Sequence, residues 1–311
     1  MQGKFDFDGL PPEIKMNLAA HLTAPDVVNL AVSSTTANYK QLFKPALNAH
    51  QLLHHVVRGE HDKVAALLKK NIKLLVQKAS VTDRSGRTFE TISAFEYALW
   101  ALDKHMWTLM LNCLSKDEDC KELVAELLTQ YEKLNTEGVT YTFRGETITE
   151  KHFDFENTII KELQTQVDSI KAPGVKNWDT IDNQWREGVG GAQKLLPMHV
   201  VYEYCSEVPF EPVPEFTVQP KSSKQFINWF TGTYENWFSA DSKLAVDFAI
   251  FKGGWCGVRL SRDAWGCGAA GGLDLIALTA LCKVRTNDFI DLKSQLGDQM
   301  TLNNHQQVSQ I

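Results

Sequence analysis

Residues 10–33 read LPPEIKMNLAAHLTAPDVVNLAVS and hold the most specific signals in the chain. Pro11 suits the first position of a helix, where its missing N–H would have no partner in any case. Ile14, Leu18 and Leu22 then recur every four residues, which places them along one apolar stripe. The segment therefore predicts a short amphipathic helix that begins near Pro11.

A second short helix is predicted to start at Pro25. Asp26 falls in its first turn, where the positive end of the helix dipole favours a carboxylate. The apolar content of this helix comes from Val27, Val28, Leu30, Ala31 and Val32. The residues from Ser33 to Thr36 offer caps for a third helix, which we expect to end before Pro45. Three helices this short cannot bury their apolar faces alone, so some must face a partner or the rest of the chain.

Leu10-Pro11-Pro12-Glu13-Ile14, followed in register by Pro25-Asp26, resembles the F-box motif. That family opens with Leu-Pro-x-Glu-Ile and continues with a second helix of the Pro-x-Asp-Leu type. It often carries a Trp after the second helix, where this chain has Tyr39. The resemblance implies docking on Skp1, the linker to cullin, through Leu10, Pro11, Ile14, Leu18, Leu22, Pro25, Val28, Leu30, Val32 and Tyr39. The alternative is an ordinary helix start that packs into its own chain.

Residues 49–68 and 93–114 each predict a pair of helices joined by a turn, at Gly59 and at Asp103. They resemble degenerate ankyrin repeats, although the two turns lie farther apart than the family period of about 33 residues. An insertion around Arg87–Ile92 would explain the difference. An F-box followed by short ankyrin-like repeats resembles secreted effectors of intracellular bacteria that borrow the ubiquitin ligase of their host. Such a protein would act in the host cytosol.

The remaining two-thirds of the chain resembles no family that we recognise. Mostly helices are expected here, with a small β-hairpin at 139–148 and helical packing of the aromatic residues between Phe226 and Phe238. The fold class is therefore predicted as mainly α: a three-helix F-box-like module, ankyrin-like helical hairpins, and a mostly helical C-terminal domain with a small β-hairpin. The expected domains are 1–46, 47–115 and 116–300, with a disordered tail at 301–311.

Composition and charge exclude several classes of protein. The formal net charge is -6 and the sequence has no long Lys/Arg run, so the basic surface of a nucleic-acid-binding protein is missing. Residues 1–10 lack the apolar region of a secretory signal peptide. The most apolar stretch, Leu273–Cys282, is short and contains Asp274, which argues against a membrane span. A cytoplasmic protein is expected.

Three motifs carry enzymatic or metal-binding alternatives. Cys256, with His199 or His152 as base, would make a hydrolase or transferase, but a buried core thiol is the competing interpretation. Residues 266–271 match GxGxxG without the βαβ pattern of a dinucleotide site, so a turn for close helix packing is favoured. His50, His54 and His55 lack a carboxylate or cysteine at ligand spacing. Neither a metal nor a cofactor is expected.

The sequence thus favours an adaptor, not an enzyme. The F-box-like module would bind Skp1, and residues 47–311 would hold an unidentified target for ubiquitination. Two other functions stay open: a cysteine-dependent hydrolase or transferase that uses Cys256, and a helical-repeat scaffold with no link to ubiquitin. The sequence does not indicate which residues would contact a target.

Overall fold

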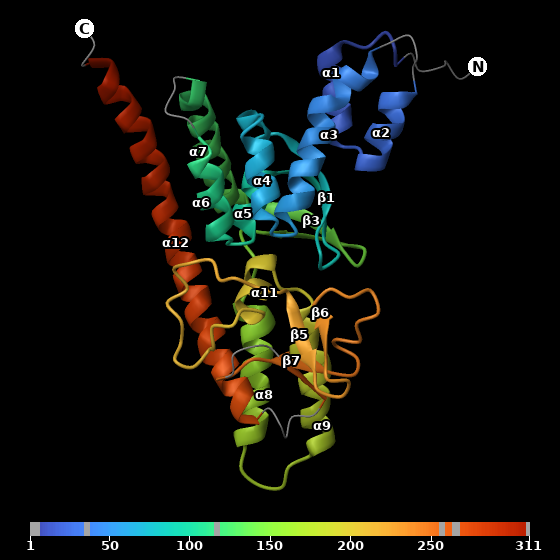
Figure 1. Ribbon diagram of the computed structural model, residues 1–311, viewed down its shortest axis with the longest axis vertical. Helices are drawn as coiled ribbons and strands as arrows, with labels where there is room; N and C mark the ends of the chain where they lie inside the picture. Colours follow the sequence, from blue (N-terminus) through green and yellow to red (C-terminus); the bar gives the residue numbers. More distant parts are fainter. Residues whose placement is uncertain (1–6, 34–37, 115–118, 255–258, 263–267, 309–311) are drawn as a thin grey trace. The chain divides into compact units, whose positions relative to one another are not determined.

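The computed structural model describes residues 7–33, 38–114, 119–254, 259–262 and 268–308. The chain divides into two compact units (Figure 1). The first unit runs up to His152 and also takes in the chain from Asp291 onward, and the second comprises Phe153–Ile290. Each unit contains its own four-stranded sheet.

The first unit opens with three helices, α1 (Pro12–Ala20), α2 (Ala24–Val32) and α3 (Tyr39–Val56). Both α1 and α2 pack against α3. Thr23 caps α2, because its hydroxyl oxygen accepts a hydrogen bond from the backbone N–H of Asp26 at 3.4 Å. The helix starts expected near Pro11 and Pro25 are therefore confirmed.

The third helix differs from the prediction. Asn38 is its N-cap, and it continues through Pro45 to Val56 instead of ending before the proline. Proline removes one backbone hydrogen bond inside a helix. The helix tolerates this loss because Phe43, Ala46 and Ala49 on the same helix are buried. The domain boundary predicted after residue 46 consequently falls within one continuous helix.

Two helix pairs follow, as the sequence predicted. α3 packs against α4 (His61–Leu68), and α5 (Ala94–Trp100) packs against α6 (Lys104–Asn112); α3 also contacts α5, and α4 contacts α6. A capping box starts α5: the hydroxyl of Ser93 accepts from the N–H of Glu96 at 3.0 Å, and the carboxylate of Glu96 accepts from the N–H of Ser93 at 2.9 Å. The two pairs stack side by side (Figure 1).

The segment between the pairs adds strands that the sequence did not predict. After a 3₁₀ turn, η1 (Ile72–Leu75), β1 (Lys78–Thr82) and β2 (Thr88–Ser93) form a hairpin. The long helix α7 (Asp119–Glu137) leads into β3 (Val139–Phe143) and β4 (Glu146–Glu150), which confirms the hairpin expected at 139–148. The antiparallel sheet has the order β1-β2-β3-β4.

The second unit contains helices of mixed type. η2 (Glu156–Ile160) and η3 (Gln184–Val189) are π-helical, and the α-helices are α8 (Lys161–Lys171), α9 (Trp178–Asn183), α10 (Gly190–Gln193) and α11 (Met198–Tyr204). Pro197 is the N-cap of α11, which separates this helix from α10. The last helix, α12 (Gly268–Val308), extends to Val308, where the sequence predicted a disordered tail from Thr301.

The sheet of the second unit corrects the predicted fold class. It has the order β6-β5-β8-β7 and is built from β5 (Gln225–Asn228), β6 (Thr233–Asn236), β7 (Ala249–Phe251) and β8 (Arg259–Ser261). With two four-stranded sheets the protein is mixed α/β, and the prediction of a mainly α fold with one small hairpin was wrong. Helical packing was expected for the aromatic residues between Phe226 and Phe238. This stretch instead turns at Gly232, whose φ of +68° suits a hairpin connection.

Candidate interaction surface

Helix α1 buries one face and exposes another. Lys15 and Ala19, four residues apart, are buried on the face that meets α3. Ile14 and Leu18, also four residues apart, are 46% and 42% exposed. Two members of the apolar stripe that the sequence predicted, Ile14 and Leu18, therefore lie at the surface. Leu22, its expected third member, lies beyond the end of the helix and is half-buried.

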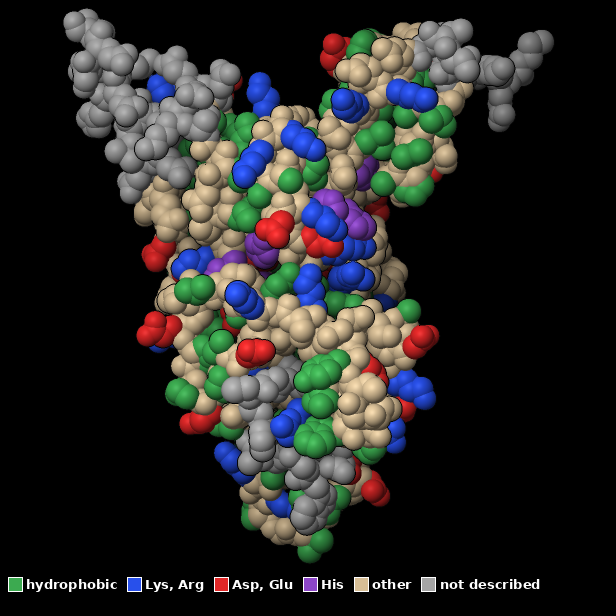
Figure 2. Space-filling view, in the orientation of Figure 1, with side chains coloured by type: hydrophobic (Ala, Val, Ile, Leu, Met, Phe, Trp, Pro, Cys, Tyr) green, Lys and Arg blue, Asp and Glu red, His purple; other side chains and the backbone are tan. Residues whose placement is uncertain are grey.

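Helix α2 repeats this arrangement. Val27 and Ala31 are buried, whereas Val28 and Val32, one residue further along in each case, are 47% and 57% exposed. The surface of these N-terminal helices carries several hydrophobic side chains (Figure 2). Four exposed aliphatic side chains on two nine-residue helices form what we call the outer aliphatic set: Ile14, Leu18, Val28 and Val32.

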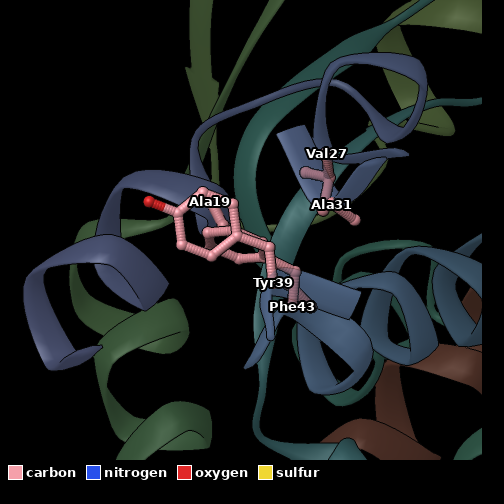
Figure 3. Close-up of a cluster of buried hydrophobic side chains, with 6 residues drawn as sticks. Ala19, Val27, Ala31, Tyr39 and Phe43 are labelled. Atoms are coloured by element: carbon pink, nitrogen blue, oxygen red, sulfur yellow. The ribbon is translucent and has the colours of Figure 1, made fainter. Parts of the chain in front are cut away.

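The opposite faces of these helices are buried in a cluster of hydrophobic side chains from the same unit (Figure 3). The buried cluster consists of Ala19, Val27, Ala31, Tyr39, Phe43 and Ala46. Three of the six are alanines, and such small side chains let the helices approach α3 closely. Because this core forms without the outer aliphatic set, that set is available to a partner.

Tyr39 contacts residues from three parts of the module: Asp8 before α1, Lys15 in α1 and Phe43 in α3. Its hydroxyl donates a hydrogen bond to the carboxylate of Asp8, and its ring meets that of Phe43 edge-on at 5.4 Å between centroids. The ammonium of Lys15 lies 5.5 Å from the centre of the Tyr39 ring and donates to the backbone carbonyl of Asp8 at 2.9 Å. Sequence reasoning missed Lys15, because nothing local indicates that this lysine, rather than Ile14, faces inward.

The ten residues predicted to contact Skp1 fall into three groups. Six are exposed, three are half-buried, and Tyr39 is buried. The exposed residues are Pro11, Ile14, Leu18, Pro25, Val28 and Val32, and the half-buried ones are Leu10, Leu22 and Leu30. The structure thus places Tyr39 in the interior of the module, not on its surface.

Side-chain contacts join the segment at the end of α1 to the first sheet. The hydroxyl of Ser80 in β1 donates to the backbone carbonyl of Leu22 at 3.1 Å, and the side chains of His21 and Thr91 lie 3.2 Å apart. These contacts tie the N-terminal helices to the hairpin that separates the two helix pairs. The outer aliphatic set is therefore presented on a supported module within the first unit.

A pocket of about 460 Å³ opens beside β2 and β3 in the first unit. The two strands share a single paired position, Thr88 with Thr142, and the pocket is lined from both strands and from α7. Its charged lining residues are Lys78, Glu90, Glu96, Lys133 and Glu137. Lys78 and Glu96 already form an ion pair at 2.7 Å. This mixture of charges favours no one class of ligand, and no sequence motif indicated the pocket.

Three described cysteines, Cys113, Cys205 and Cys282, do not have the character of nucleophiles. Burial raises the pKa of Cys205 to about 12, and it also raises the pKa of Cys113 and Cys282. A reactive thiol needs a lowered pKa, since the thiolate is the attacking form. Cys256, the candidate nucleophile, lies outside the described residues. His199, its possible base, is buried with its ring beside that of Phe155.

The histidines of α3 take part in ordinary contacts. A ring nitrogen of His55 lies 2.5 Å from the carboxylate of Glu60. The Nδ1 atom of His50 forms a hydrogen bond of 3.0 Å with the backbone carbonyl of Ser80. Burial lowers the pKa of His54, and the nearby Arg58 lowers it further. Across the described ranges, no cluster of three or more His, Cys, Asp or Glu side chains is arranged to hold a metal ion.

Comparison with known proteins places the chain in a family. A family model described as the CBUA0006 C-terminal domain matches residues 158–296. A protein of Coxiella burnetii (strain RSA 493 / Nine Mile phase I), named "Uncharacterized protein CBUA0006", is 36% identical over 274 residues. The match covers 80% of this chain and 75% of that protein. The chain belongs to the CBUA0006 family. No solved structure matches it.

The region matched by the CBUA0006 C-terminal domain contains a buried charged cluster. Lys252 is fully buried, and its ammonium donates to the backbone carbonyls of Glu203 and Ser206 at 2.6 and 2.9 Å. The carboxylate of Asp274 accepts from the N–H groups of Lys252 and Gly253, the latter at 2.6 Å. Burial raises the pKa of Asp274 to about 7. These contacts join the end of α11, the segment after β7 and the start of α12.

Helix α12 of this CBUA0006 family chain starts within a glycine-rich stretch. The GxGxxG match at 266–271 lies partly outside the described residues, and α12 begins at Gly268. A Cβ atom added at Gly271 would lie 3.6 Å from the ring of Trp185, at ordinary contact distance. A small side chain would therefore fit at Gly271, and the packing interpretation of the motif stays a prediction. Within the described part of the chain, the helices lack an apolar run long enough to span a membrane.

Proposed function

We propose that the chain is an F-box-like adaptor that binds host Skp1 and recruits a target protein to an SCF-type (Skp1-cullin-F-box) E3 ubiquitin ligase. The observation that carries the proposal is the outer aliphatic set on α1 and α2. These side chains are exposed although the core beneath them is complete. A binding partner that covered them would remove apolar surface from water, which is the main favourable term in association.

In this proposal the predicted contact residues have different roles, according to their exposure. Pro11, Ile14 and Leu18 on and before α1, with Pro25, Val28 and Val32 on α2, supply the contacts to Skp1. Leu10, Leu22 and Leu30 support these positions from partly buried sites. Tyr39 acts indirectly, since it holds Asp8 and Lys15 against α3. The role needs no catalytic residue in the chain itself.

Residues beyond α3 would present the target. The stacked helix pairs and the second unit offer surfaces for it, and the structure does not single one out. The relative in a bacterium agrees with the bacterial source that this proposal assumes. Action in the host cytosol, as a secreted effector, belongs to the same proposal.

A pull-down with purified Skp1 tests the proposal. Wild-type chain is expected to retain Skp1, whereas Leu10→Ala/Pro11→Ala and Ile14→Ala/Leu18→Ala should retain much less. Asn17→Ala, at an exposed polar position on the same helix, and Val175→Ala, at a fully exposed valine of the second unit, are the matched controls. Equal retention by all variants, or none by the wild type, would sink the proposal. Retention of Skp1 without cullin from host cells would favour a scaffold with no link to ubiquitin.

A further inference from the structure

The connection between β5 and β6 exposes three aromatic side chains. Trp229 is 54% exposed, Phe230 is 61% exposed and Tyr234 is 68% exposed. Most large aromatic side chains of the described chain are buried, and Phe226 and Trp237 on the same two segments are 0% and 2% exposed. The exposure is therefore confined to the end of the hairpin, where Asn228 pairs with Thr233.

The hairpin end is well ordered by its own hydrogen bonds. The N–H of Gly232 donates to the carbonyl of Asn228 at 2.7 Å, and the N–H of Phe230 donates to the side-chain oxygen of Asn228 at 3.0 Å. The positive φ of Gly232 lets the chain reverse at this point. The backbone that carries the exposed rings is thus held in a closed turn, which lowers the cost of ordering it on binding.

Two arginines lie against these rings. The guanidinium carbon of Arg259 is 4.4 Å from the centre of the Trp229 ring, and that of Arg262 is 4.2 Å from the centre of the Phe230 ring. β8 brings them there, because it pairs with β5 at Ile227 and Arg259. One end of the sheet therefore combines exposed aromatic surface with two positive charges, on a chain whose net charge is -6.

The chemistry of the tip favours a lipid surface as partner. Trp229 and Phe230 are consecutive, and more than half of each side chain is exposed although an arginine lies against each ring. Trp and Tyr favour the headgroup level of a membrane, and arginines beside them meet lipid phosphates.

We propose that this aromatic–arginine tip (Trp229, Phe230, Tyr234, Arg259 and Arg262) docks on the surface of a membrane that contains anionic lipid. The rings enter the headgroup region and the guanidiniums bind phosphate groups, for which their planar shape is suited. Docking of this kind is peripheral and reversible, and it weakens as salt screens the charges. The tip works independently of Skp1 binding, which would use α1 and α2.

Co-sedimentation of the full chain with lipid vesicles tests this inference. One set of vesicles contains phosphatidylcholine alone and the other contains phosphatidylcholine mixed with phosphatidylserine. Wild-type chain is expected to sediment with the anionic vesicles at low salt and less at high salt. Trp229→Ala/Phe230→Ala should weaken binding at least tenfold. Arg259→Gln/Arg262→Gln should weaken it about fivefold for each arginine and flatten the dependence on salt.

Two further variants test whether a loss of vesicle binding is specific to the tip. Trp229→Phe keeps an aromatic ring at the tip and should retain most of the binding. Val218→Ala removes a side chain that is 76% exposed in the same unit, and binding should stay unchanged. Several results would overturn the inference: no sedimentation of the wild type, equal sedimentation with both kinds of vesicle, or equal binding by all variants. Tip-dependent binding of a protein without any vesicle binding would also overturn it and assign the tip to a protein partner.

Discussion

The hydroxyl of Tyr39 donates a hydrogen bond to the carboxylate of Asp8, and the two residues are 31 positions apart in the chain. The F-box motif, which the sequence resembles, often has a Trp at this point. A buried tyrosine is accommodated when its polar end finds a hydrogen-bond partner. Because only 4% of Tyr39 is exposed, we expect substitutions there to affect the stability of the three helices more than the surface that they present.

Substitutions at Tyr39 should separate stability from binding. Tyr39→Phe removes the hydrogen bond to Asp8 and is expected to lower the free energy of unfolding by about 0.5–1.5 kcal/mol. Tyr39→Ala also leaves a cavity, and the loss should be about 3–5 kcal/mol. Urea unfolding, with hydrogen exchange of the α3 amides as a local probe, measures both. Val32→Ala, at an exposed position, should change stability by less than about 0.5 kcal/mol.

The Tyr39 variants also test whether Tyr39 contacts Skp1 directly or acts only from the interior of the module. Tyr39→Phe should bind Skp1 as tightly as the wild type under conditions in which α3 stays protected from exchange. A large loss of affinity with full protection would show that Tyr39 touches the partner directly, and the assignment of Tyr39 to the interior would then fail.

A buried ion pair should stabilise the β1–β2 turn. The carboxylate of Asp83 accepts from the N–H groups of Ser85 and Arg87, each at 2.9 Å, and lies 3.4 Å from the guanidinium of Arg87. Asp83→Ala leaves the buried charge of Arg87 without this partner, so we expect a loss of about 3–5 kcal/mol in stability of the first unit. Hydrogen exchange of the β1 and β2 amides would report it. Arg84→Ala, at an exposed position in the same turn, is the control. If Asp83→Ala lowered the stability as little as Arg84→Ala does, the expectation would be contradicted.

Asp274 should give the second unit a stability that depends on pH. Burial raises its pKa from 3.8 to about 7, and hydrogen bonds from Gly253 and Lys252 and the charge of Lys252 offset this only in part. The folded state therefore holds the proton more tightly than the unfolded chain. It follows that the contribution of Asp274 to stability is most favourable below about pH 4 and declines as the pH rises toward 7.

Asp274→Asn tests this dependence. The neutral amide still offers an oxygen to the N–H groups of Gly253 and Lys252 and has no proton to lose. Relative to the wild type, the variant should thus gain stability between pH 4 and pH 7, as measured by urea unfolding and exchange of the α11 amides. Asp241→Asn, at an exposed position, controls for the loss of one carboxylate. A wild-type-to-variant difference that is constant over this range would refute the assignment.

Local signals predicted the local structure well. Pro11, Pro25 and Asp26 act within a single turn, so the starts of α1 and α2 could be found from the sequence. The Gly145 turn, with φ of +85°, likewise marked the β3–β4 hairpin. These residues act on the backbone next to them, and no distant contact is needed to interpret them.

Features that depend on distant contacts were missed. Ile14 and Lys15 are neighbours on α1, and the choice of which one faces inward is made by Asp8 and Tyr39. Likewise, β5 forms because it pairs with β6 and with β8, whose Arg259 is 32 residues after Ile227. Aromatic residues spaced by three or four positions favoured a helix there, and tertiary pairing overrode that pattern.

The most direct test of Skp1 binding is the affinity of purified Skp1 for the full chain, measured by isothermal titration calorimetry. The wild type is compared with Ile14→Ala/Leu18→Ala/Val28→Ala/Val32→Ala, which truncates the outer aliphatic set and leaves the core intact. We expect a measurable Kd for the wild type, an increase in Kd of at least about tenfold in the variant, and little change in unfolding free energy. A wild type that does not bind Skp1, or a variant that binds equally well, would contradict this expectation.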